Sequence, residues 1–278
     1  MLRRCLLAVI VALLVTMTNS QIAAAEDYDW NKAKRIGTKA EFASYIESER
    51  RKGNTKFRVI LTNTHAFGFY TLSDFNNFYV QMLAPCLKPN LWMSMDESNR
   101  TAQLTFEMTE FPGIRVANAY LSRNQQQAWM NLSDEEKELY NIAVAIVDDA
   151  NKLSSEREKA RYIHDAICNR VESFKFIEHA TAINALVYKK TDCDGFAESF
   201  YMLGLMSGLN VREIYGTSKG GDGQWGNHAW NWITFSDGKS YCIDVTNGFN
   251  TKSSLYLWTF ERMKNLYSCE WEIIPNLQ

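Results

Sequence analysis

Apolar residues recur with helical spacing in two stretches of the second half of the chain. One stretch follows Ser133 and Glu136, and the other follows Ser155 and Glu158. In each pair a serine stands three residues before a glutamate, which is the spacing of a capping box at a helix start. The apolar positions on one helix face are Leu139, Ile142, Ala143, Ile146, Val147 and Ala150 in the first stretch, and Ala160, Ile163, Ile167 and Val171 in the second. We therefore expect two amphipathic helices.

The preceding part of the chain shows shorter, mixed patterns. Thr38 and Glu41 have capping-box spacing before a helix, and residues 57–62 form a β-rich run. These patterns predict a small α+β accessory region over residues 26–130. The second domain is expected over residues 131–278.

Two further runs in the accessory region favour strands. Apolar and polar residues alternate over residues 104–108, and Ile114 and Val116 fall on one face of a second run. Pro112-Gly113 lies between the runs and is typical of a turn. We expect a hairpin here.

The N-terminus has the pattern of an export signal. Arg3 and Arg4 precede an apolar run over residues 6–15, and three alanines at 23–25 suit a signal peptidase, so we expect cleavage before Glu26. The apolar run is well short of the roughly 20 residues that span a bilayer. We therefore expect an exported protein, secreted or held in the cell envelope, with no membrane span after cleavage.

The amino-acid composition excludes several classes of protein. The chain has 278 residues, 46% of them hydrophobic, and carries 30 Lys and Arg against 32 Asp and Glu. This much apolar content excludes a disordered chain, and the near-neutral charge gives no reason to expect a nucleic-acid partner. Cleavage at Glu26 would remove one of six cysteines. In an exported protein the odd number that remains leaves a thiol unpaired or joined to another chain.

Cys193 is the first residue along the chain whose sequence context favours a reactive, nucleophilic side chain. Short polar residues precede it, and a helical pattern with Phe196, Phe200 and Leu203 on one face follows it. Cys193 is therefore expected at a helix N-terminus, where free N–H groups and the helix dipole favour a thiolate.

Two aromatic, β-rich runs follow and are expected to pair as strands. His228 lies in the first, residues 226–235, and Asp244 lies in the second, residues 241–246. A nucleophilic thiol needs a base, and the base needs a group that fixes its tautomer. Cys193, His228 and Asp244 can fill these roles in order.

The register of the two strands tests this hypothesis, because side chains alternate between faces. A three-residue loop over 236–238 pairs Phe235 with Lys239 and brings Asp244 next to His228 on one face. A two-residue turn would put these side chains on opposite faces. We predict the three-residue loop.

Each of these residues also has a structural explanation. A helix cysteine is often a small buried hydrophobe, a strand histidine is often structural, and an aspartate near a turn is often a turn residue. The ordered combination favours catalysis. Cys242 and His164 are expected to be packing residues, and no cofactor or metal is expected because paired Cys/His ligand spacing is absent.

Aromatic and glycine residues near His228 leave two alternatives open. Trp225, Trp230 and Trp232 could line an acyl channel or pack in the core. The glycine-rich segment 216–226 could be a mobile flap or a hairpin connection.

At these motifs the sequence resembles the transglutaminase-like superfamily, whose fold is related to papain-like cysteine peptidases. The layout is most similar to exported bacterial members with an N-terminal accessory region. The resemblance covers about residues 135–247, and its most specific parts are the Cys193 segment and His228-Ala229-Trp230-Asn231. It implies an α+β papain-like core in which a helix-borne cysteine packs on an antiparallel sheet. It also implies Cys193 as nucleophile, His228 as base and acid, and Asp244 as orienting carboxylate.

The sequence departs from the family pattern at two places. Asn247-Gly248 stands where Trp-Asp is usual, and Asp192 and Asp194 bracket the nucleophile. Negative charges there oppose thiolate formation unless they turn outward. Both departures bear on substrate choice and activity.

The resemblance implies cysteine-dependent acyl transfer on peptide or glutamine-type amides through a thioester. Hydrolysis and amine cross-linking both remain open, as does the second oxyanion donor. The expected partners are protein or peptide substrates, with cell-wall peptides as one candidate. The alternative function is a weakly active or inactive binding module for cell-wall or protein partners.

Overall fold

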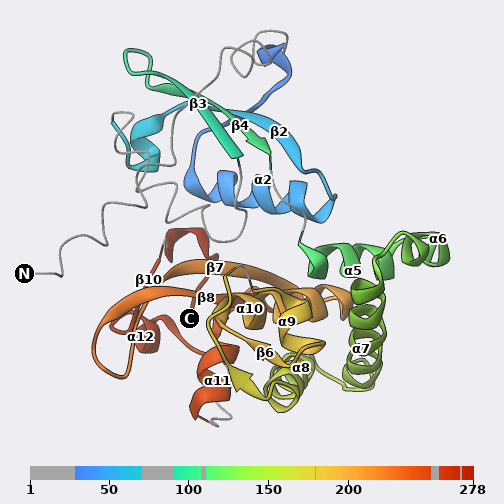
Figure 1. The fold of residues 1–278 in the computed structure, drawn as a ribbon. Helices are drawn as coiled ribbons and strands as arrows, with labels where there is room; N and C mark the ends of the chain where they lie inside the picture. The colour runs from blue at the N-terminus through green and yellow to red at the C-terminus, as the bar shows by residue number, and fades with distance from the viewer. Residues whose placement is uncertain (1–28, 71–89, 108–110, 179, 252–256, 270) are drawn as a thin grey trace, which may run out of the picture. The chain divides into compact units, whose positions relative to one another are not determined.

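The computed structural model describes residues 29–70, 90–107, 111–178, 180–251, 257–269 and 271–278 (Figure 1). The predicted signal segment 1–25 and Cys86 lie outside these residues. Contacts divide the chain into two compact units, Met1–Lys34 and Arg35–Gln278. Among the described residues no helix is both long enough and apolar enough to cross a membrane.

The N-terminal region combines one helix with a four-stranded sheet. Its elements are η2 (Trp30–Lys32), β1 (Lys34–Ile36), α2 (Lys39–Arg51), β2 (Lys56–Leu61), η3 (Thr64–Phe67), β3 (Asn90–Asp96) and β4 (Thr101–Glu107). The strand order is β1-β2-β4-β3, with β4 antiparallel to both β2 and β3. The predicted capping box forms, because the Thr38 side chain and Glu41 exchange hydrogen bonds at the start of α2.

The predicted strand at Ile114 and Val116 is wrong. Residues Pro112–Leu121 form helix α5, with Pro112 in its first turn, where a missing N–H costs no hydrogen bond. Ile114 and Val116 are both buried in the core of the second half of the chain. This core therefore begins before residue 131, the predicted domain boundary.

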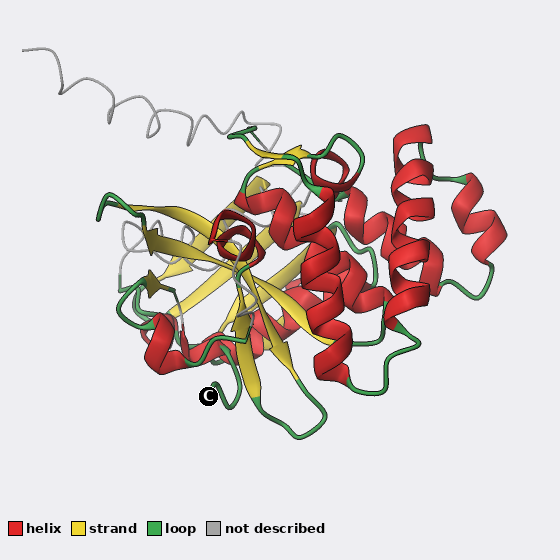
Figure 2. Cartoon of the chain, turned by 90° about the horizontal axis from the view of Figure 1, so that it is seen from below, coloured by secondary structure: helices red, strands yellow, loops and turns green. Residues whose placement is uncertain are grey.

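The second half of the chain is built of helices and an antiparallel sheet (Figure 2). Its helices are α6 (Gln125–Met130), α7 (Asp134–Ala150), α8 (Glu156–Arg170), α9 (Ala182–Leu186), α10 (Cys193–Met206), α11 (Val245–Thr251), α12 (Phe260–Met263) and η4 (Trp271–Ile273). Its strands are β5 (Ser173–Phe174), β6 (Lys190–Thr191), β7 (Asn210–Lys219), β8 (Trp225–Thr234), β9 (Ser240–Ile243) and β10 (Tyr267–Ser268). The main sheet has the order β10-β7-β8-β9. The capping boxes predicted for α7 and α8 are both formed.

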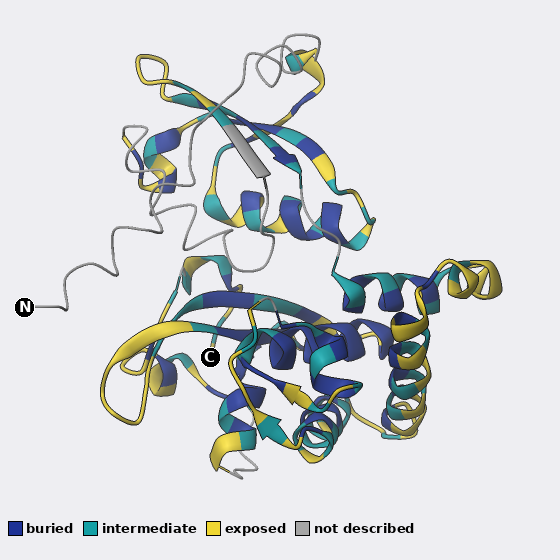
Figure 3. Cartoon of the chain, viewed as in Figure 1, coloured by how far each residue is buried: buried dark blue, intermediate teal, exposed yellow. Residues whose placement is uncertain are grey.

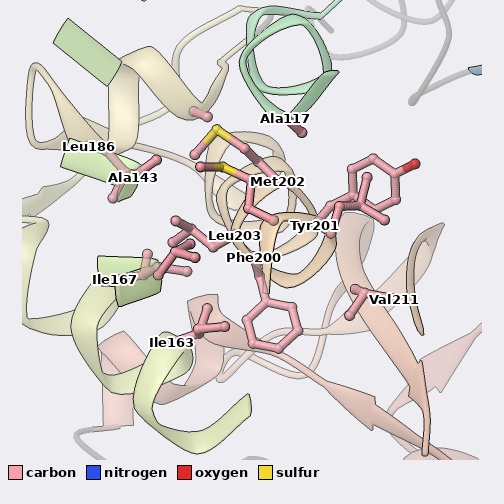
Figure 4. Close-up of a cluster of buried hydrophobic side chains, with 14 of the residues drawn as sticks. Ala117, Ala143, Ile163, Ile167, Leu186, Phe200, Tyr201, Met202, Leu203 and Val211 are labelled. Atoms are coloured by element: carbon pink, nitrogen blue, oxygen red, sulfur yellow. The ribbon is translucent and has the colours of Figure 1, made fainter. Parts of the chain in front are cut away.

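Helix α10 is the centre of this core. It packs against β7 and β8 of the sheet and against α5, α8 and α9. Met202, Leu203 and Phe200 on α10 lie among apolar side chains such as Ile163 and Ile167 of α8 (Figure 4). From Gly195 to Met206 every residue of α10 is buried (Figure 3). The predicted α+β fold, with a helix-borne cysteine packed on an antiparallel sheet, is confirmed.

Candidate functional site

Cys193 is the first residue of α10, as the sequence predicts. Asp192 caps the helix: its carboxylate accepts hydrogen bonds from the backbone N–H of Asp194 at 3.1 Å and of Ile177 at 3.2 Å. Gly195 lets the first turn approach its neighbours, because a side chain there would collide with Thr191 and with the backbone of Thr181. The start of the helix is therefore held tightly in place.

The Cys193 thiol is partly exposed and lies beside a small apolar cluster of Ala197, Tyr215 and Ala229. Its Sγ is 3.8 Å from Oδ1 of Asp194. Asp194 is thus not turned away from the thiol. Asp192 is buried, and burial raises the pKa of its carboxyl.

The three-residue loop predicted between β8 and β9 is confirmed. Phe235 and Lys239 pair through a backbone hydrogen bond of 3.0 Å, and Gly238 adopts a φ of +80°. The register that follows pairs Trp232 with Cys242. It brings His228 and Asp244 together, with Nε2 of His228 at 2.8 Å from Oδ2 of Asp244.

Asp244 is 1% exposed, and both its oxygens are engaged. Oδ1 accepts from the backbone N–H of Asn247 at 2.9 Å. Oδ2 accepts from the Tyr267 hydroxyl at 2.6 Å as well as bonding to His228. Burial works to raise the pKa of Asp244, but the positive charge of His228 and these hydrogen bonds outweigh it and hold the pKa below its usual value.

His228 is held as a cation. Burial acts to lower the pKa of its ring, but the charge and hydrogen bond of Asp244 raise it to about 10. Cys193 also acts to raise the pKa of the ring. Because Nε2 is bonded to Asp244, Nδ1 is the ring nitrogen that remains for the thiol. The structure bonds His228 to Asp244, and it packs Cys193 against Ala229, the residue next to His228.

The other residues considered from the sequence are explained by packing or by exposure at a hairpin end. Cys242 and His164 are buried, as expected of packing residues. Trp230 and Trp232 belong to an apolar cluster with Trp258, whereas Trp225 is exposed. Within the glycine-rich segment 216–226, residues 219–226 form the exposed end of the β7–β8 hairpin (Figure 3).

Sequence patterns missed Tyr267 and Glu198. Tyr267 is distant along the chain from the three motifs, and no local pattern links it to Asp244. Glu198 lies in α10, and its carboxylate accepts from the backbone N–H of Gly113 and of Ala182, each at 2.7 Å. A charged residue on the buried helical face was the available signal for Glu198.

Among the described residues, one group has ligand atoms close enough to hold a metal ion: Asp192, Cys193 and Asp194, within 4.8 Å of one another. The Asp192 carboxylate already accepts two backbone hydrogen bonds as the helix cap. The group is therefore explained by the start of the helix.

The fold and the site define a class of protein: an α+β domain with a cysteine at the start of its central helix. On the sheet packed against that helix, a strand histidine bonds to an aspartate at the end of the next strand. Residues 143–244 match the model of the transglutaminase-like superfamily. Over these residues the chain is similar to that superfamily. No curated protein sequence matches the chain.

Solved structures show distant likeness. A TGase crystal structure aligns with 68% of this chain and 50% of its own, at 16% identity and a TM-score of 0.35. A proposed cysteine protease from Cytophaga hutchinsonii aligns with 57% of this chain and 62% of its own, at 14% identity and a TM-score of 0.32. The periplasmic domain of TgpA from Pseudomonas aeruginosa, bound to ethylmercury, aligns with 58% and 66%, at 9% identity and a TM-score of 0.34. The chain thus spans less than two thirds of the length of the first two structures.

Proposed function

We propose that the protein is a cysteine-dependent acyltransferase or amide hydrolase that works through a thioester on Cys193. One observation carries the proposal: the His228 imidazole bonds at 2.8 Å to the buried Asp244 carboxylate, on a strand that packs against the helix whose first residue is Cys193. A cationic imidazole beside a thiol favours the thiolate, which is the nucleophilic form. Similarity to the transglutaminase-like superfamily supports this chemistry.

In the first half-reaction the Cys193 sulfur attacks the carbonyl carbon of a carboxamide or peptide bond. The C–N bond then breaks, His228 gives its proton to the departing ammonia or amine, and a thioester remains. The backbone N–H of Cys193 is the proposed donor to the developing oxyanion. Asp244 keeps the His228 ring oriented through both steps.

In the second half-reaction water or a primary amine attacks the thioester carbon. His228 accepts the proton of this attacking group, and the C–S bond breaks to restore the Cys193 thiolate beside the imidazolium. Water yields hydrolysis, and an amine yields cross-linking. Polypeptides are the proposed substrates, with cell-wall peptides as one candidate class.

The pH dependence of iodoacetamide labelling tests the site. Cys193 is expected to react faster near pH 7 than a model thiol, and His228→Ala is expected to slow it about tenfold or more, because the cation that favours the thiolate is lost. His65→Ala, which removes a histidine of the N-terminal region, is the matched control. If Cys193 reacts no faster than a model thiol in either protein, the binding-module alternative is favoured.

We also infer that residues 1–25 direct export and are removed. The two arginines, the short apolar run and the alanines before Glu26 support this proposal. Intact-mass measurement of the secreted protein should show a chain that begins at Glu26. A retained N-terminus would contradict it.

A further inference from the structure

We propose that Tyr267 is a positioning residue of this site, whose hydroxyl holds the Asp244 carboxylate in the orientation that serves the His228 ring. The hydroxyl donates to Oδ2 of Asp244 at 2.6 Å, and this oxygen is also the partner of His228 Nε2 at 2.8 Å. Tyr267 thus acts on His228 through a shared oxygen. The catalytic part of the inference rests on the proposed function.

The carboxylate is fixed from both ends. The backbone N–H of Asn247 holds Oδ1 at 2.9 Å, and the Tyr267 hydroxyl holds Oδ2. With donors on both oxygens, rotation of the carboxylate about its last bond would break a hydrogen bond in a buried place, which is costly. His228 therefore meets an acceptor whose direction is already set.

The tyrosine ring is held as firmly as its hydroxyl. Tyr267 lies on β10 and pairs with Ser218 of β7. Its ring packs edge-on against Trp230, with centroids 5.2 Å apart, and against Trp258, with centroids 6.1 Å apart. The same ring lies 5.8 Å from that of His228, so it also covers one side of the imidazole.

The negative charge on Oδ2 of Asp244 acts on both Tyr267 and His228. Burial and the negative charge of Asp244 raise the pKa of Tyr267 far above its usual value, so the hydroxyl keeps its proton and remains a donor. A second donor on Oδ2 takes part of the negative charge that would otherwise act on His228 alone. The other titratable or charged groups that act on this network are Cys193, His164, Cys242 and Arg262.

Removal of the hydroxyl should therefore strengthen the pull of Asp244 on the His228 proton. Tyr267→Phe keeps the ring and its packing but leaves Oδ2 to His228 alone. We expect the pKa of His228 to rise by roughly 0.5 to 1 unit, the size of a partly shared charged hydrogen bond. A more tightly held proton is given less readily to a leaving group, so kcat should fall while KM stays unchanged.

Ring-carbon NMR of labelled histidine measures this directly, since the chain has four histidines and the His228 signal is the one lost in His228→Gln. Tyr201→Phe is the matched control, because its buried hydroxyl donates to Glu47 at 2.6 Å instead. A rise in the His228 pKa in Tyr267→Phe, absent from Tyr201→Phe, supports the proposal. An unchanged or lowered His228 pKa overturns it.

The NMR result does not depend on turnover. If the unaltered protein shows no acyl transfer, the proposed function fails, while the His228 titration still decides whether Tyr267 acts on the ring. If acyl transfer occurs and Tyr267→Phe alters neither kcat nor the titration, the positioning role fails and the proposed function stands.

Discussion

Asp194 is a charge beside the thiol that the proposed chemistry must accommodate. Its Oδ1 lies 3.8 Å from the Cys193 sulfur. Two like charges at this separation repel by about 1 kcal/mol in water. The imidazolium of His228 opposes this repulsion, so the reactivity of Cys193 reflects the balance of the two neighbours.

Asp194→Asn removes the repulsive charge and keeps the size of the side chain. Iodoacetamide should then label Cys193 roughly fivefold faster at pH 6 to 7, which is the rate equivalent of about 1 kcal/mol. Asp148→Asn, on the exposed face of α7, serves as the control and should leave the rate unaltered. An equal or slower rate in Asp194→Asn would show that the carboxylate does not act on the thiolate.

At the scale of elements, Glu198 joins three helices. It projects from α10, and its two oxygens accept from the first turns of α5 and α9, through Gly113 and Ala182. Helix N-termini attract negative charge, so one carboxylate satisfies donors of two helices. Burial nevertheless raises the pKa of Glu198 to about 8, against the effect of these donors and of Arg50.

This raised pKa predicts a pH-dependent stability. The Glu198 carboxyl binds its proton more tightly in the folded protein than in the unfolded chain. The free energy of unfolding should therefore fall as the pH rises from about 4.3, the pKa of an unfolded glutamate, to about 8, the pKa of folded Glu198. Glu198→Gln cannot ionise and should lose this part of the slope, while its overall stability is lower because one N–H loses its acceptor.

Urea unfolding of both proteins at pH 5, 6, 7 and 8 measures the difference. The stability gap between them should narrow as pH rises. His228 contributes equally to both proteins, so its own titration cancels. A gap that is constant over this range would contradict the raised pKa of Glu198.

The sequence predicts some helices and strands correctly and others wrongly. Helices α7 and α8 were predictable because capping boxes and apolar spacing agree, and the β8–β9 register followed from one loop length. Helix α5 was misread, because Pro112-Gly113 suits both a turn and a helix start, and Ile114 and Val116 are both buried. Only the packing of α5 against α10 decides between the two.

In the candidate site too, local sequence patterns do not show contacts between segments that are far apart in the chain. Cys193, His228 and Asp244 could be found because each lies in a local pattern that fixes its element. Tyr267 and Glu198 act through contacts between segments far apart in the chain, and their local sequence does not show these partners.

At the scale of the whole molecule, a buried ionic network joins α2 to the core. Arg50 of α2 contacts Glu213 of β7 at 2.9 Å, and both side chains are at most 5% exposed. Tyr201 of α10 lies under the Arg50 guanidinium and donates to Glu47 of α2. Burial raises the pKa of Glu213, and Arg50 opposes this rise.

Arg50→Met should destabilise the protein by about 3 to 5 kcal/mol, because it leaves Glu213 buried without its partner. The double variant Arg50→Met/Glu213→Met should be less destabilised than the sum of the single variants. Lys152→Met, which breaks an exposed pair with Asp149, should change the free energy of unfolding far less than Arg50→Met does. Additive effects in urea unfolding would contradict a coupled buried pair.

Acyl transfer through Cys193 can be tested by incubating the protein with an acyl donor and an amine. A glutamine-containing peptide is mixed with a labelled primary amine and the protein, and products and intact protein are followed by mass spectrometry. We expect an amine adduct or free acid of the peptide, together with a thioester mass on Cys193, and loss of all three in Cys193→Ala. Product formation that persists in Cys193→Ala would contradict it.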